Sequence, residues 1–185
     1  MTLAPNVRKF ALTVHVVVSV GWVGVVAGFL ALAVAGLFSA DAQLGRASYL
    51  AMDFTYRTVV IPLGLASLIT GVISSLGTDW GLFRHYWVVI KLLITLPAVW
   101  LMLVHLRPVA YAALAASATT FAGADLGGLR GQLVLYAGAA SLVLLTATGL
   151  STYKPRGRTR YGARKLARVK PVMTSVERLP SREAQ

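Results

Sequence analysis

Four long stretches of the chain are almost entirely apolar, and short polar segments separate them. They cover residues 10–38, 58–76, 87–106 and 133–150. Each is close to the ~20 residues that a helix needs to cross a hydrocarbon core about 30 Å thick. None alternates apolar and polar residues with a period of two, which argues against membrane strands. The pattern therefore predicts an all-α, polytopic membrane protein built as a bundle of four transmembrane helices.

Composition supports this class and excludes others. Apolar residues make up 57% of the 185 residues, charged residues only 13%, and the chain contains no cysteine. Mean hydropathy is +0.70. These values exclude a disordered chain, a secreted disulfide-rich domain and an ordinary soluble enzyme. Without cysteine there is no thiolate ligand and no cysteine nucleophile. The first apolar stretch is too long for a signal-peptide core, so we expect it to be retained as a helix.

Basic residues predict how the chain is oriented. The formal net charge is +12, and basic residues are concentrated in residues 154–185. We expect two parts: a four-helix transmembrane domain at 1–153 and a basic, largely disordered tail at 154–185. By the positive-inside rule, both termini would lie in the cytoplasm, with the helices in a bacterial plasma membrane. The tail would contact anionic lipid head groups. Binding of nucleic acid is not expected, because no nucleic-acid-binding fold surrounds these charges.

Two of the connecting segments also have a helical pattern. Asp41 is placed to cap a helix through 43–57. Asp53 and Arg57 are four residues apart, in the favourable order for a helical ion pair. Pro62 would kink or begin the membrane part of the second span, and Ala-rich 109–121 would prolong the third helix. One face of the helix at 43–57 carries apolar residues: Leu44, Ala47, Leu50 and Phe54.

Polar and small residues indicate which helix faces point inward. In the first span His15, Ser19 and Trp22 share one face. Small residues define packing faces in the second and fourth spans: Gly64, Ser67, Gly71 and Ser74 in the second, and Ala137, Ser141 and Thr148 in the fourth. The third span has the most informative stripe, formed by Trp87, Lys91, Thr95, Ala98, Met102 and His105.

The glycines of the first span predict a second packing surface. Gly21, Gly24 and Gly28 lie nearly opposite the His15 face and include a G-x-x-x-G pattern. A homodimer through the first helix would use these glycines. The alternative is that the second or fourth helix of the same chain covers them.

Two basic side chains lie at the same depth on different helices. His15 and Lys91 are both about 7 Å from the cytoplasmic end of their spans, at 1.5 Å per residue. This placement suits axial ligation of one haem between the helices, with Lys91 neutral, or a site for a proton or an anion. Arg8, Lys9 and Arg84 lie at the adjacent interface, where haem propionates would bind. Alternatively, Lys91 extends to the head groups and His15 only bonds a neighbouring helix.

A resemblance bears on this pair. The run Leu12-Thr-Val-His-Val-Val-Val-Ser-Val-Gly-Trp-Val-Gly resembles the first helix of the copper-resistance D-type membrane proteins and of the membrane-embedded bacterial protoporphyrinogen oxidase. In the oxidase, a later Trp-x-x-x-Lys-Leu is similar to Trp87-Val-Val-Ile-Lys91-Leu92. The resemblance implies that His15 and Lys91 ligate a b-type haem. Over most of 1–162, including 77–91, the chain also resembles a family of uncharacterised four-helix membrane proteins, and that likeness implies no activity.

Three classes of function stay open at this point. The first is haem b binding for electron transfer or porphyrin chemistry. The second is a non-catalytic membrane scaffold or accessory subunit, and the third is a small transporter coupled to a proton or an anion. His105 and Met102 are weak candidates for a second redox or metal centre near the outer surface, where a lone interfacial histidine is the simpler interpretation. Whether the protein is an enzyme is left open.

Overall fold

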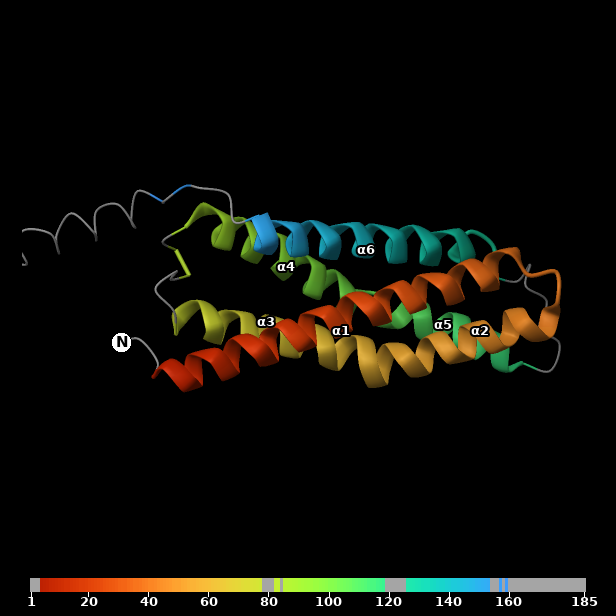
Figure 1. Cartoon of the computed structure of the whole chain (residues 1–185). Helices are drawn as coiled ribbons and strands as arrows, with labels where there is room; N and C mark the ends of the chain where they lie inside the picture. The colour runs from red at the N-terminus through yellow and green to blue at the C-terminus, as the bar shows by residue number, and fades with distance from the viewer. Residues whose placement is uncertain are drawn as a thin grey trace, which may run out of the picture.

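The computed structural model describes residues 4–77, 82–83, 85–118, 126–153, 157 and 159. Every element of regular structure in these ranges is helical (Figure 1). In chain order they are α1 (Pro5–Phe38), α2 (Ala42–Thr55), the π-helical turn η1 (Tyr56–Val60), α3 (Ile61–Leu76), α4 (Tyr86–Val104), α5 (Leu106–Ser117) and α6 (Leu129–Tyr153).

These elements form four rods, each long and apolar enough to cross a membrane. α2, η1 and α3 run on as one helix over Ala42–Leu76, and α4 continues into α5 over Tyr86–Ser117. With α1 and α6, this gives four spans packed as a bundle. The predicted fold class is therefore confirmed: the chain is an all-α, four-helix integral membrane protein, and its helices contact the lipid bilayer.

The rods are longer than the apolar stretches that predicted them. At 1.5 Å per residue, the 34 residues of α1 extend about 50 Å, well beyond a ~30 Å hydrocarbon core. The bundle has two ends (Figure 1). The end that holds Pro5, Leu76, Tyr86 and Tyr153 is called the tail end here. The opposite end, where α1 turns into α2 and α5 leads to α6, is called the loop end.

Large apolar side chains face outward, and the interior is formed largely by small ones. Phe10, Trp100 and Leu142 are each about two-thirds or more exposed in the isolated chain. Ser67, Ser74 and Ala137, which are small residues of the predicted packing faces of α3 and α6, are buried between helices instead. This distribution suits a protein in lipid, because hydrocarbon solvates large apolar side chains while small residues let helices approach closely.

Several local predictions are confirmed. Asp41 caps α2, with its carboxylate accepting from the backbone N–H of Gln43 at 2.8 Å. Asp53 and Arg57 form the expected ion pair at 2.9 Å. Just before Pro62, the second span changes from an α-helix to the π-helical turn η1 and then back to an α-helix. α5 prolongs the third span to Ser117, after a break at His105.

The apolar face of α2 points away from the bundle. Leu44, Leu50 and Phe54 are exposed. The buried residues of α2 are Gly45, Ser48, Tyr49 and Met52. α2 packs against α1 and α5 through this second face, whose small residues let the helices approach closely.

One residue of the predicted α6 face is also misplaced. Ala137 is buried and Ser141 is half-buried, but Thr148 is exposed. The buried face of α6 is Leu133, Ala137, Leu144 and Ala147. Thr148 returns its hydroxyl to the carbonyl of Leu144 at 2.8 Å, so its polar group is satisfied within its own helix and can face outward.

Hydrogen bonds from Arg130 of α6 connect three helices at the loop end. Its guanidinium donates to the carbonyl oxygens of Gly36, at 2.8 Å, and Leu37, at the end of α1. It also donates to the hydroxyl of the fully buried Tyr49, at 3.2 Å. The last carbonyls of a helix lack partners within the helix and carry partial negative charge, which a cation offsets. This single side chain therefore ties α6 to both α1 and α2.

Candidate functional site

The predicted inward faces of α1 and α3 meet through small residues. The Ser19 and Ser67 hydroxyls are 2.8 Å apart, and Ser74 donates to the Ala11 carbonyl at 3.2 Å. A side-chain carbon added to Gly71 would be 3.0 Å from the His15 ring. Gly71 thus lets α3 lie directly against His15 and fixes the imidazole between the two helices.

Lys91 of α4 reaches the same imidazole from the other side. Its Nζ lies 3.4 Å from His15 Nε2 and donates to the Ser151 hydroxyl of α6 at 2.9 Å. His15 Nδ1 lies 3.1 Å from Thr70 Oγ1. We call His15, Lys91, Thr70 and Ser151 the basic cluster. It brings four helices together near the tail end, and both basic residues are half-buried.

The hydrogen bonds assign the protons of the cluster. Thr70 uses its hydroxyl proton on the Ala66 carbonyl at 2.7 Å, so its oxygen accepts from His15 Nδ1–H. A neutral imidazole with its proton on Nδ1 accepts at Nε2, where Lys91 donates. The Lys91 ammonium has three N–H groups, and two of them have these partners within the described chain.

The described carboxylates are far from this charge. Asp41 and Asp53 belong to α2 and its cap, toward the loop end of the bundle. Arg8 and Lys9 lie in the first turns of α1, on the same side as the cluster, and are exposed. Arg84 and the basic tail at 154–185 fall outside the described residues, apart from two uncharged positions. The described surroundings of Lys91 thus hold further positive charge and hydroxyls.

The geometry bears directly on haem binding. Metal–nitrogen bonds are about 2 Å long, so two axial ligands place their nitrogens about 4 Å apart, on opposite faces of the macrocycle. His15 Nε2 and Lys91 Nζ instead share a hydrogen bond at 3.4 Å, with Gly71 and Ser151 packed on either side. As placed, this pair does not fit a porphyrin between its two nitrogens, and α1 and α4 would have to separate to admit one.

The sequence pattern found the two basic residues but not all of their partners. Thr70 and Ser151 were not assigned to the site. Each hydroxyl returns a hydrogen bond to its own helix, as hydroxyls in membrane helices commonly do, so neither residue type by itself indicates a site. The available signal is spacing: Thr70 lies three residues after Ser67, and Ser151 lies four residues after Ala147, which is buried.

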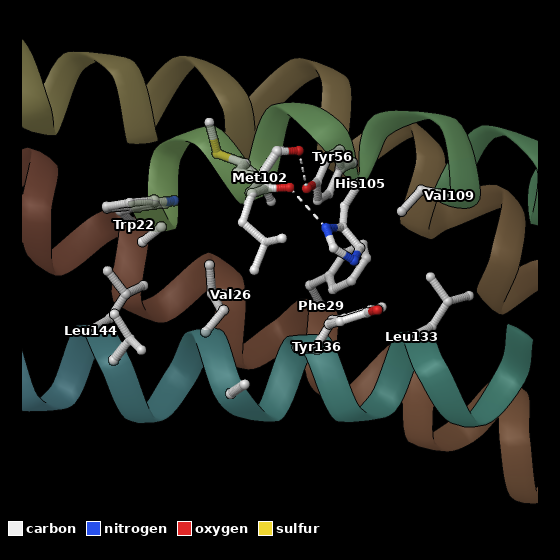
Figure 2. A pocket seen from close by; sticks show the side chains of 17 residues that line it. Trp22, Val26, Phe29, Tyr56, Met102, His105, Val109, Leu133, Tyr136 and Leu144 are labelled. Atoms are coloured by element: carbon white, nitrogen blue, oxygen red, sulfur yellow. Dashed lines mark hydrogen bonds between the residues drawn. The ribbon is translucent and has the colours of Figure 1, made fainter. Parts of the chain in front are cut away.

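His105 and Met102 lie elsewhere, on the wall of an apolar cavity toward the loop end (Figure 2). His105 donates Nδ1–H to the Leu101 carbonyl at 2.8 Å, and its ring contacts the Tyr136 ring edge-on, with 3.9 Å between centroids. Among the described residues, no group of three or more histidine and carboxylate side chains could hold a metal ion. The polar stripe of the third span therefore contributes to two separate sites. Lys91 belongs to the basic cluster, and Met102 and His105 line the apolar cavity.

The glycine face of α1 is open over most of its length. Gly21 faces α3, where an added carbon would be 3.6 Å from Leu63. Carbons added to Gly24 and Gly28 would have no described neighbour within 4 Å, and both residues are exposed. Within the described chain, the second span therefore covers only the first of the three glycines.

Comparison with known proteins adds no relative: no family model, no curated protein and no solved structure matches this chain. The four apolar spans make it a multi-pass membrane protein.

Proposed function

We propose that this membrane protein is a small transporter that takes up a proton together with an anion at the basic cluster. The observation that supports the proposal is the contact of two basic side chains, His15 and Lys91, at 3.4 Å. No described carboxylate belongs to the cluster. Within the described residues, the pair therefore has no carboxylate counter-ion, and one Lys91 N–H has no acceptor.

The contact couples the two ligands. Protonation of His15 would add a proton at Nε2, next to the Lys91 ammonium. Two unit charges 3.4 Å apart repel by about 5 kcal/mol at an effective dielectric constant of about 20. A small anion at Lys91 cancels this repulsion and accepts from both groups. His15 therefore holds a proton most easily when an anion is bound, which is the requirement for coupled uptake.

The bundle offers places where the helices can change shape. Pro97 lies inside α4, six residues beyond Lys91, and η1 is a π-helical turn in the second span. Prolines and π-helical turns weaken the regular backbone hydrogen bonds and are common positions of helix bending. Beyond Ser19 and Ser67, the interior becomes apolar at Trp22. We infer that access from the loop end requires bending at these positions.

Flux measurements test the proposal. The purified protein is reconstituted into liposomes that contain a pH-sensitive dye, and an inward gradient of chloride, nitrate or phosphate is applied. We expect at least one anion to drive acidification of the lumen. Replacing Lys91 with Met removes a charge-assisted hydrogen bond of about 1.5–3 kcal/mol, so anion affinity should fall about ten- to hundredfold. His15→Ala should abolish the proton flux while the protein stays folded.

A matched control separates the site from general damage. Thr146→Ala likewise removes a polar side chain from a membrane helix, but this residue is exposed on α6 and, among the described residues, bonds its own helix at Leu142. It should transport as the wild type does. The proposal fails if no anion moves protons in the wild type, or if His15→Ala and Lys91→Met transport normally.

Haem ligation is a second candidate, because the nitrogens of His15 and Lys91 do meet at one level between α1 and α4. It requires a structure in which these helices are further apart. The test is an absorption spectrum of protein expressed with added haem. A Soret band that His15→Ala abolishes, that Lys91→Met alters and that His85→Ala leaves intact would assign the pair to haem. A colourless protein without flux would favour a scaffold or accessory subunit.

A further inference from the structure

The apolar cavity toward the loop end is distinct from the basic cluster, none of whose residues lines it. It has a volume of about 120 Å³ and lies between α1, η1, α4, α5 and α6. Five aromatic rings contribute to its walls: Trp22, Phe29, Tyr56, His105 and Tyr136 (Figure 2). In another protein, an apolar cavity of about 150 Å³ stays dry and binds benzene. The volume here is thus close to that of a single six-membered ring.

One wall of the cavity carries a polar group without a partner. Trp22 is 4% exposed, and its Nε1–H has no hydrogen-bond acceptor among the described residues. Figure 2 shows the nitrogen-bearing edge of this indole turned toward the space between Met102 and Val26. Buried N–H groups are almost always paired, and leaving one unpaired costs about 1–3 kcal/mol. An acceptor on a molecule in the cavity would recover this energy.

Contacts on the other side hold the indole in this position. A carbon added to Gly64 of α3 would be 2.8 Å from the Met102 sulfur and 3.0 Å from Trp22 Cε2. The missing side chain therefore lets the Trp22 ring and Met102 lie against the α3 backbone. The Tyr56 hydroxyl is not a second donor for a ligand in the cavity, because it already donates its proton to the Met102 carbonyl at 2.6 Å.

Two exposed lining residues indicate where a ligand could enter the cavity. Two of its lining residues, Leu101 of α4 and Ala139 of α6, are also exposed on the outer surface of the bundle. Both belong to the middle of membrane-spanning helices. A molecule that enters between α4 and α6 therefore comes from the hydrocarbon phase.

We propose that this cavity binds the ring of a lipid-soluble quinone, with one ring carbonyl accepting from Trp22 Nε1–H. The carbonyl matches the buried Trp22 donor, and the flat ring matches the volume and the aromatic walls, since aromatic groups favour stacked and edge-to-face contacts. A prenyl tail would leave between α4 and α6, where the lining residues Leu101 and Ala139 are exposed. Esters and fatty acids of the bilayer also carry a carbonyl group on an apolar chain. However, an acyl chain cannot form stacked or edge-to-face contacts with the five aromatic rings.

Calorimetric titration in nanodiscs tests the proposal, with a decyl-substituted benzoquinone as one probe and methyl oleate as the other. We expect saturable binding of the quinone and not of methyl oleate. Trp22→Phe keeps an aromatic ring but removes the N–H, and should weaken quinone binding about tenfold. Trp100→Phe is the matched control, because Trp100 is 65% exposed on the lipid face of α4, and should leave binding unchanged.

A second variant keeps the test decisive if Trp22→Phe does not fold. Ala137 is buried on the cavity wall, so Ala137→Leu should fill the space and abolish binding of the quinone. Absence of quinone binding to the wild type overturns the proposal. Preferential binding of methyl oleate assigns the cavity to an acyl lipid instead. Equal binding by wild type and Ala137→Leu would place the quinone outside this cavity, which also contradicts the proposal.

Discussion

Gly36→Ala is expected to destabilise the loop end of the bundle by a clash with a single rigid side chain. A carbon added to Gly36 of α1 would be 2.8 Å from Tyr49 Cζ and 3.0 Å from Cε1. The tyrosine cannot easily move away, because it is 1% exposed and its hydroxyl accepts from Arg130 at 3.2 Å. Contacts below 3.0 Å between carbons require the ring or the helix to shift.

Two opposing effects determine the size of the change. Overpacking of this kind costs about 1–3 kcal/mol. Replacement of a helical glycine by alanine returns about 1 kcal/mol. The net free energy of unfolding should therefore fall by up to about 2 kcal/mol. At about 2–4 °C per kcal/mol for a chain of this size, Gly36→Ala should lower Tm by up to about 8 °C.

The control removes the contribution of helix propensity. Gly138 lies within α6, and a carbon added there would meet no described atom within 4 Å. Gly138→Ala should therefore gain the alanine preference without the clash and melt at or slightly above the wild type. The assay is thermal unfolding in dodecyl maltoside, followed by far-UV circular dichroism for the wild type and both variants.

A double variant identifies the clashing partner. If Tyr49 is the obstacle, Gly36→Ala should cost much less in a Tyr49→Leu background, with a coupling free energy of about 1–3 kcal/mol. The reasoning is refuted if Gly36→Ala melts as high as Gly138→Ala. It is also refuted if the cost of Gly36→Ala is the same with Tyr49 and with Leu at position 49.

Two further predictions concern the whole chain. Gln43 and Tyr153 are exposed at opposite ends of the bundle, so in intact cells an impermeant thiol reagent should label Gln43→Cys and not Tyr153→Cys; the reverse pattern would contradict the positive-inside orientation. Gly24→Leu combined with Gly28→Leu should convert a detergent-stable dimer to a monomer on size-exclusion chromatography with light scattering, because both glycines are open on the surface of α1; a wild type that is already monomeric in mild detergent and in nanodiscs would exclude this dimer.

The class of fold follows from the chain alone. Runs of about 20 apolar residues are sufficient to predict membrane helices, since only a continuous helix satisfies its backbone hydrogen bonds in hydrocarbon. The same reasoning predicts that a histidine and a lysine inside these runs face protein and not lipid. Local signals work equally well at Asp41 and at the Asp53–Arg57 pair, because both partners of each interaction are close in sequence.

The tertiary structure decided what those local signals leave open. The outward apolar face of α2 could not be predicted from its pattern, because the same amphipathic helix turns its apolar side inward in water and outward in lipid. The direct contact of His15 with Lys91, and the choice of Thr70 and Ser151 as partners, depend on how four helices are rotated against each other. The unpaired Trp22 N–H is likewise a result of packing. A tryptophan always carries an N–H donor, but the positions of the neighbouring helices decide that this donor has no acceptor beside an apolar cavity.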